Sequence, residues 1–135
     1  MAQRPFQAGA AINLDSGESS KEVVIFAVPE KKRFHVKSLG INGFGQPNQP
    51  LFYAVHVTTG SRVGIYPVAP TGVAEIDEPE FPARYFGSQE LTLYADPGSD
   101  LIFTVARKDT TGNVRVLIDI SGILVDVRAR SQTDR

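Results

Sequence analysis

The chain has 135 residues, with 14 basic and 15 acidic side chains and a formal net charge of −1. This length fits one domain with its own core, and the absence of cysteine excludes disulfides and thiolate metal sites. A nearly neutral chain has no overall attraction to nucleic acid or to an anionic membrane. The sequence has neither an apolar run long enough to span a membrane nor a signal peptide. We therefore expect a protein made in the cytoplasm, without nucleic-acid or membrane partners.

Short apolar stretches punctuated by 9 prolines and 12 glycines predict an all-β domain. No proline falls inside the main expected strands, because proline cannot donate a hydrogen bond to a ladder. In chain order, strands are expected at Glu22–Val28, Arg33–Asn42, Leu51–Thr58, Ser61–Tyr66, Val73–Ile76 (with an irregular extension to Phe86), Glu90–Ala95, Leu101–Arg107 and Val114–Val127.

Two turns and two strand irregularities can be placed from the pattern. The Asp96-Pro-Gly-Ser turn suits type II, and Gly112 is free to take a positive φ in the next reversal. In the last strand the apolar positions change from even to odd at Ser121-Gly122, which predicts a β-bulge. A similar slip predicts a second bulge around Ser38–Gly40.

Eight antiparallel strands with short turns predict a β-sandwich of the jelly-roll kind. An immunoglobulin-type sandwich is the alternative, although its usual tryptophan and cysteines are missing here. The sandwich domain is expected over residues 22–127, between an N-terminal arm (1–21) and a polar tail (128–135). These ends are either frayed or ordered on a neighbouring subunit. The segment starting at Phe6 offers a short β-like stretch that either adds to a neighbour's sheet or covers the edge of its own domain.

The residues that usually carry catalysis are sparse. The chain has only two histidines, His35 and His56, and neither stands in a His-x-His pair or near a carboxylate. Serine-hydrolase elbows and phosphate-binding glycine motifs are also absent. We therefore expect no catalytic residues, no metal and no cofactor.

Two charge clusters are candidate interaction sites. The basic stripe consists of Lys31, Lys32, Arg33 and Lys37. The acidic cluster consists of Glu75, Asp77, Glu78 and Glu80. Each is either a solvated surface or a contact with another chain, and the acidic cluster could alternatively hold calcium. A glycan could instead bind on exposed aromatic side chains. The candidates are Phe44, Tyr53, Tyr66, Tyr85, Phe86 and Tyr94.

Two segments resemble small bacterial β-sandwich proteins of unassigned function. The first is Val28-Pro-Glu-Lys-Lys-Arg-Phe-His-Val; the second pairs Leu93-Tyr-Ala-Asp-Pro-Gly-Ser with Ile120-Ser-Gly-Ile-Leu-Val-Asp-Val. The resemblance covers residues 22–127 and implies the fold but no activity. Those relatives often begin with an export signal, and we expect none here. By architecture the chain looks like a phage capsid decoration (cement) protein.

These observations predict a non-catalytic structural or interaction protein on the surface of a virion. Its expected partners are further copies of itself, with a trimer favoured, and a major capsid protein. Several strands carry apolar residues on both sides, which requires cover from loops, tails or another chain. The alternative from another class is a carbohydrate-binding module on the same sandwich.

Overall fold

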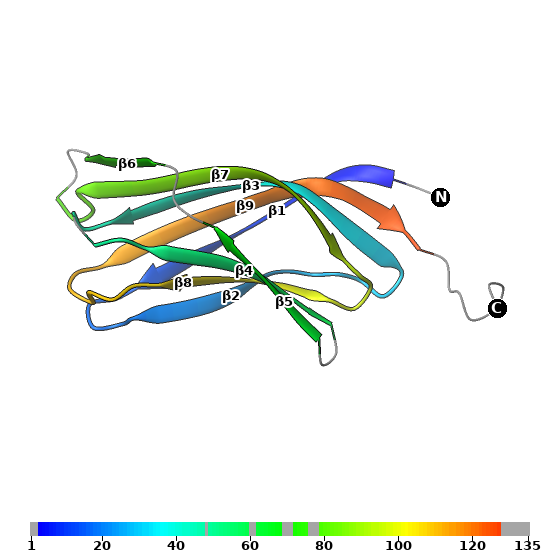
Figure 1. Cartoon of the computed structure of the whole chain (residues 1–135), viewed down its shortest axis with the longest axis horizontal. Coiled ribbons are helices and arrows are strands. Elements are labelled where there is room, and N and C mark those ends of the chain that lie inside the picture. The colour runs from blue at the N-terminus through cyan, green and yellow to red at the C-terminus, as the bar shows by residue number, and fades with distance from the viewer. Residues whose placement is uncertain (1–2, 48, 60–61, 69–71, 76–78, 128–135) are drawn as a thin grey trace.

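The computed structural model describes residues 3–47, 49–59, 62–68, 72–75 and 79–127. These residues form nine strands in two layers (Figure 1). The strands are β1 (Gln3–Leu14), β2 (Ser20–Ala27), β3 (Lys32–Gly45), β4 (Phe52–Thr59), β5 (Arg62–Val68), β6 (Gly72–Glu75), β7 (Ala83–Ala95), β8 (Asp100–Ala106) and β9 (Val114–Asp126). No helix in this part of the chain is long and apolar enough to cross a membrane.

The strand order identifies the topology. One sheet runs β1-β9-β3-β7-β6 and the other runs β2-β8-β4-β5, with antiparallel pairing throughout. The first strand of the chain thus pairs with the last, β2 with β8, β3 with β7, and β4 with β5. This is an antiparallel ribbon rolled into two layers, which is the jelly roll. The predicted jelly-roll sandwich is confirmed, and the immunoglobulin-type alternative is wrong.

The core lies between the sheets and follows strict alternation. In β8, Leu101, Phe103 and Val105 are fully buried, while the residues between them are half-buried. Phe34 of β3 is also fully buried and meets Phe6 and Phe26 edge-on, at 5.4 and 5.7 Å between ring centroids. Apolar burial of this kind is the main term that stabilises a sandwich of this size.

The predicted N-terminal arm needs correction. Residues Gln3–Leu14 form β1, which pairs along its whole length with β9 of the same chain, and Ile12 and Leu14 belong to the core. Phe6 packs against Phe26 at 4.7 Å, so its apolar side chain is used within its own domain. The prediction that Phe6 serves a neighbouring subunit is therefore wrong. The alternative of an edge strand covering its own domain describes the structure, and it raises the strand count above eight.

One of the two predicted bulges is present. Val36 pairs with Gly122, but Ser38 pairs with Ser121, so Lys37 has no partner on β9. The buried side of β3 accordingly changes from Phe34 and Val36 to odd positions beyond the bulge. The predicted slip in β9 is wrong, because Leu124 is buried and continues the even series of that strand. The polar and small residues at 121 and 122 face the bulge of β3 instead.

Gly122 is the position where β9 approaches the bulge most closely. A Cβ atom there would lie 2.0 Å from the carbonyl oxygen of His35 and 3.0 Å from the Cα atom of Val36. Backbone atoms of a central strand cannot move aside as a flexible side chain can, so only glycine fits. The two predicted turn glycines also have the expected geometry. Gly98 and Gly112 have φ values of 81° and 84°, and Ser99 N–H donates to the Asp96 carbonyl at 3.0 Å.

We expect Gly122→Ala to lower the free energy of unfolding by more than about 2 kcal/mol, through the clash with the β3 backbone. Gly40→Ala is the matched control, because a Cβ atom at Gly40 of the same sheet would have no neighbour within 4 Å. Chemical denaturation of the three proteins measures the difference. An equal stability of the two variants would contradict the account of the bulge.

Candidate functional site

The outer face of the β2-β8-β4-β5 sheet is apolar. One row of register partners crosses all four strands of this sheet: Val24, Ile102, His56 and Ile65. Ile65 is 58% exposed, and Phe52 on the neighbouring strand is 53% exposed. Val24 and Val63 add further exposed aliphatic surface. We call this surface, comprising Val24, Phe52, Ala54, His56, Val63, Ile65, Pro67, Ile102, Thr104 and Ala106, the apolar face.

Polar groups inside the apolar face are few and partly paired. His56 Nε2 lies 3.1 Å from the hydroxyl oxygen of Thr104 on the adjacent strand. Two charged residues lie in the rows beside it: Glu22 pairs with Thr104, and Asp100 pairs with Thr58, the partner of Val63. A contiguous exposed apolar patch with a polar border is typical of a protein interaction surface.

The outer face of the other sheet is polar and hollowed around the bulge. One hollow of about 620 Å³ is lined by side chains from four strands. Its lining comprises Gln7, Ser38, Leu39, Gly40, Ser88, Gln89, Glu90, Asp119, Ile120 and Ser121. A second hollow of about 610 Å³ shares Ser38 and Glu90 with the first and adds His35, Lys37, Thr92 and Tyr94. A third shares Gln7, Lys37 and Ser121 with them. We call the three together the polar groove.

The polar groove has an aromatic wall. The rings of His35 and Tyr94 stack with 4.3 Å between centroids and 29° between planes. Tyr94 is 56% exposed, so one face of its ring is open to a partner. Ser38 and Ser121 form part of the floor, and their hydroxyl oxygens lie 2.6 Å apart.

The structure divides the predicted basic stripe into separate parts. Lys32 forms an ion pair with Asp126, and the Arg33 side chain pairs with Asp96 at 2.9 Å. Lys31 is exposed in the β2–β3 turn, while Lys37 occupies the bulge and lines the polar groove. The Lys32 ammonium group holds the pKa of the Asp126 carboxyl below its usual range. Two of the four basic residues, Lys32 and Arg33, therefore form ion pairs within the chain.

The predicted acidic cluster lies at the opposite end of the sandwich from Lys31. Glu75 ends β6 beside Ala83, which pairs with Gly45 at the far end of β3. Glu80 is exposed, and its carbonyl accepts a hydrogen bond from Gln46 at 3.0 Å. Asp77 and Glu78 lie outside the described residues. Within the described ranges, no three His, Cys, Asp or Glu side chains gather as a metal site would require.

Most of the aromatic candidates for glycan contact are occupied. Tyr53 and Tyr85 are buried, and the Tyr53 hydroxyl donates to the Tyr85 carbonyl at 3.3 Å. Burial raises the pKa of the Tyr53 hydroxyl far above its usual range. The guanidinium group of Arg84 lies over the rings of Phe44 and Phe86, at 5.9 and 5.3 Å from their centroids. Tyr66 and Tyr94 are the exposed tyrosines.

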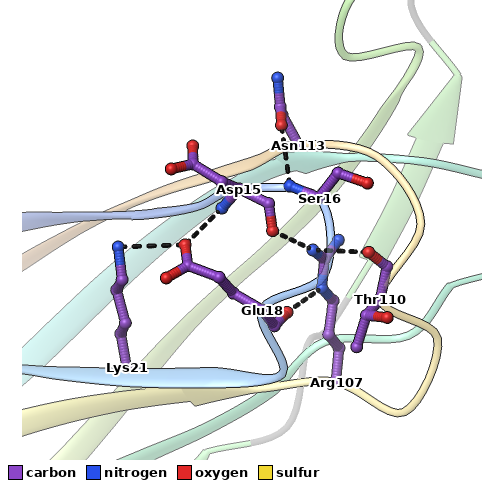
Figure 2. A network of polar contacts seen from close by, with 7 residues as sticks. All are labelled: Asp15, Ser16, Glu18, Lys21, Arg107, Thr110 and Asn113. Atoms are coloured by element: carbon purple, nitrogen blue, oxygen red, sulfur yellow. Dashed lines mark hydrogen bonds and ion pairs between the residues drawn. The ribbon is translucent and has the colours of Figure 1, made fainter.

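A buried arginine that the sequence analysis did not single out joins two loops at one end of the sandwich (Figure 2). Arg107 is 4% exposed and donates to the carbonyls of Asp15, Glu18 and Thr110, at 3.0, 3.0 and 3.3 Å. The β1–β2 turn is thereby held against the β8–β9 loop. Ser16 N–H adds a bond to the Asn113 side chain at 3.1 Å. These carbonyl groups replace part of the hydration that the guanidinium group loses on burial, while its Nη1 is buried without a hydrogen-bond partner among the described residues.

Glu18 stabilises the same β1–β2 turn through its side chain. Its carboxylate accepts a hydrogen bond from Asp15 N–H at 2.7 Å and pairs with Lys21 at 3.1 Å. The backbone bond first, and Lys21 second, hold the pKa of the Glu18 carboxyl below its usual range. Asp109 in the facing loop also has a lowered pKa, because Thr111 N–H donates to it at 3.0 Å.

Comparisons with known proteins give distant structural likenesses. No family model matches the chain, and no curated protein matches its sequence. The chain is similar to a protein of the cyanophage Pam1 capsid at 8% identity and a TM-score of 0.49, covering 88% of this chain and 84% of that one. It is also similar to a capsid protein of the Helicobacter pylori bacteriophage KHP30 at 12% identity and a TM-score of 0.44, covering 95% and 100%. The chain is also similar to Eiger TNF from S. frugiperda, at 14% sequence identity and a TM-score of 0.38. That match covers 96% of this chain and 99% of the other.

We expect Glu18→Gln to lower the melting temperature near neutral pH but not in acid. A lowered folded pKa means that the carboxylate stabilises the fold above its unfolded pKa, about 4.3. That stabilisation is lost as the pH falls through the lower folded pKa. Melting temperatures of wild type and variant from about pH 6 to about pH 3 test this. Glu22→Gln is the control, and a difference between wild type and Glu18→Gln that persists unchanged in acid would contradict it.

Proposed function

We propose that this chain is a non-catalytic structural protein that assembles with copies of itself. The observation that carries the proposal is the apolar face, in which one uncharged row of register partners crosses all four strands of the sheet. Exposed aliphatic residues such as Val63 and Ile65 gain little from water, so covering them favours association. The core is already complete without this face, which leaves it available to a partner.

A second copy of the chain is the partner that fits best. Four strands of about seven residues cover roughly 20 by 25 Å, of the order of the surface that one partner contributes to a stable interface. The central row of the face carries no charge, so like charges of two copies would come only from Glu22 and Asp100 beside it. A net charge of −1 also leaves little long-range repulsion between copies. A face that packs against itself gives a two-fold dimer, so the trimer favoured from the sequence needs this face to meet a different surface of the next copy.

The specific form of this proposal is a decoration protein on the surface of a virion, with a major capsid protein as the second partner. The jelly roll supports it only in part, since this fold serves both viral capsid proteins and lectins. The neighbouring genes provide a direct test. Adjacent genes for a major capsid protein and a portal would support the virion role, whereas a neighbourhood of polysaccharide-degrading enzymes would contradict it.

A charge contact between copies also stays a prediction. Lys31 is exposed and forms no ion pair with another described residue, and Glu75 is exposed at the other end of the molecule. Such groups meet only across two copies, and single exposed pairs contribute about 0–1 kcal/mol each. The apolar face therefore supplies most of the association free energy in this account.

We expect Ile65→Glu to dissociate the oligomer at micromolar concentrations. Ile65 lies on the edge strand β5, and a carboxylate there would lose its water in an apolar interface without gaining a partner, so association should weaken more than about tenfold. Sedimentation velocity measures the oligomeric state. Val73→Glu is the matched control, since Val73 is 61% exposed on β6 of the other sheet. Equal association of the two variants, or a monomeric wild type, would contradict the proposal.

A further inference from the structure

The polar groove is one continuous depression, because its three hollows share lining residues. Ser38 and Glu90 join the first hollow to the second, and Gln7 and Ser121 join the first to the third. The groove crosses β1, β9, β3 and β7 at the level of the bulge. Its individual hollows have the volume of small-ligand sites, about 300–1,000 Å³.

The bulge makes the floor of the groove low. Gly40 presents no side chain, and a Cβ atom there would meet nothing within 4 Å. Ser38, Ser88 and Ser121 contribute short side chains from three neighbouring strands. A ligand can therefore approach the sheet closely and meet hydroxyl groups.

Longer polar side chains surround this floor, and their hydrogen-bonding capacity is unused. Glu90 and Asp119 bring two carboxylates into the same hollow, and neither forms a hydrogen bond or an ion pair with another described residue. Gln7 supplies an amide and Lys37 an ammonium group. Acceptors and donors thus alternate over the groove, which matches a ligand rich in hydroxyl groups better than an ion of one sign.

The aromatic wall of the groove, formed by His35 and Tyr94, supplies a flat surface for stacking. The exposed face of Tyr94 is backed by the stacked His35 ring, which holds it upright beside Glu90 and Thr92. Aromatic faces pack well against the apolar C–H face of a sugar ring, while the ring hydroxyls point sideways to polar groups. We propose that the polar groove binds a neutral oligosaccharide, with one sugar ring on Tyr94 and a later ring of the same glycan over the Ser38–Gly40 floor, roughly 13 Å or more along β7.

Most of the groove lies on the sheet opposite the apolar face, although Tyr94 at its end also lines a hollow with Val63. A protein can use one outer face for assembly and leave the other open to a glycan. The failure of either proposal leaves the other standing.

The test is a microarray of neutral glycans probed with the full chain, followed by calorimetric titration of the glycan that binds best. Tyr94→Ala should weaken binding at least tenfold, and Tyr94→Trp should retain it, because tryptophan restores the stacking face. Gly40→Tyr should also abolish binding by filling the floor, while the open space at Gly40 leaves the fold intact.

Phe52→Ala is the matched control, because it removes a similarly exposed aromatic ring from the apolar face. It should leave glycan affinity unchanged. Three results would each overturn the proposal: no neutral glycan bound on the array, binding restricted to charged glycans, or affinities of Tyr94→Ala and Gly40→Tyr equal to wild type.

Discussion

The contact between Gly122 of β9 and the backbone of β3 is the constraint on which the rest of the structure depends. The last strand passes so close to His35 and Val36 that no Cβ atom fits between them. This approach accommodates the extra residue Lys37 and changes which residues of β3 face the core. Beyond the bulge, Leu39 and Ile41 enter the core while Ser38 and Gly40 remain outside. One irregularity therefore completes the core and lowers the outer surface of the same sheet.

The two outer surfaces of the sandwich consequently differ in chemistry. In the β2-β8-β4-β5 sheet the β8-β4-β5 pairings are regular, β2 is irregular at Ile25, and the outward positions carry Val24, Phe52 and Ile65. The opposite sheet carries serine, glycine and carboxylate groups around the bulge, with Tyr94 as an aromatic wall. Hydrophobic association suits the first surface, and directional hydrogen bonding suits the second. In the two proposals above, the first surface serves assembly and the second holds a polar ligand.

Local patterns predicted much of the fold, because alternation and turn chemistry act over few residues. A strand was expected at Leu101–Arg107, and Gly98 and Gly112 were expected in turns that suit a positive φ. The edge strand β1 was missed because Ala8, Gly9 and Ala10 have little hydrophobic contrast and pair with residues more than a hundred positions away. For the same reason the sequence placed Tyr94 on an exposed face but could not bring it together with His35, on which its ring stacks. Arg107 looked like an ordinary strand end, since its carbonyl partners come from a distant turn.

The central claim is that copies of this protein associate through the apolar face and leave the polar groove open. Side-chain footprinting with a photo-generated carbene, at increasing protein concentration, tests it most directly. The account predicts that labelling of Val24, Phe52 and Ile65 falls as the oligomer forms, while labelling of Tyr94 stays constant. Constant labelling of the apolar face in an oligomeric sample, or protection of Tyr94 in its place, would contradict the account.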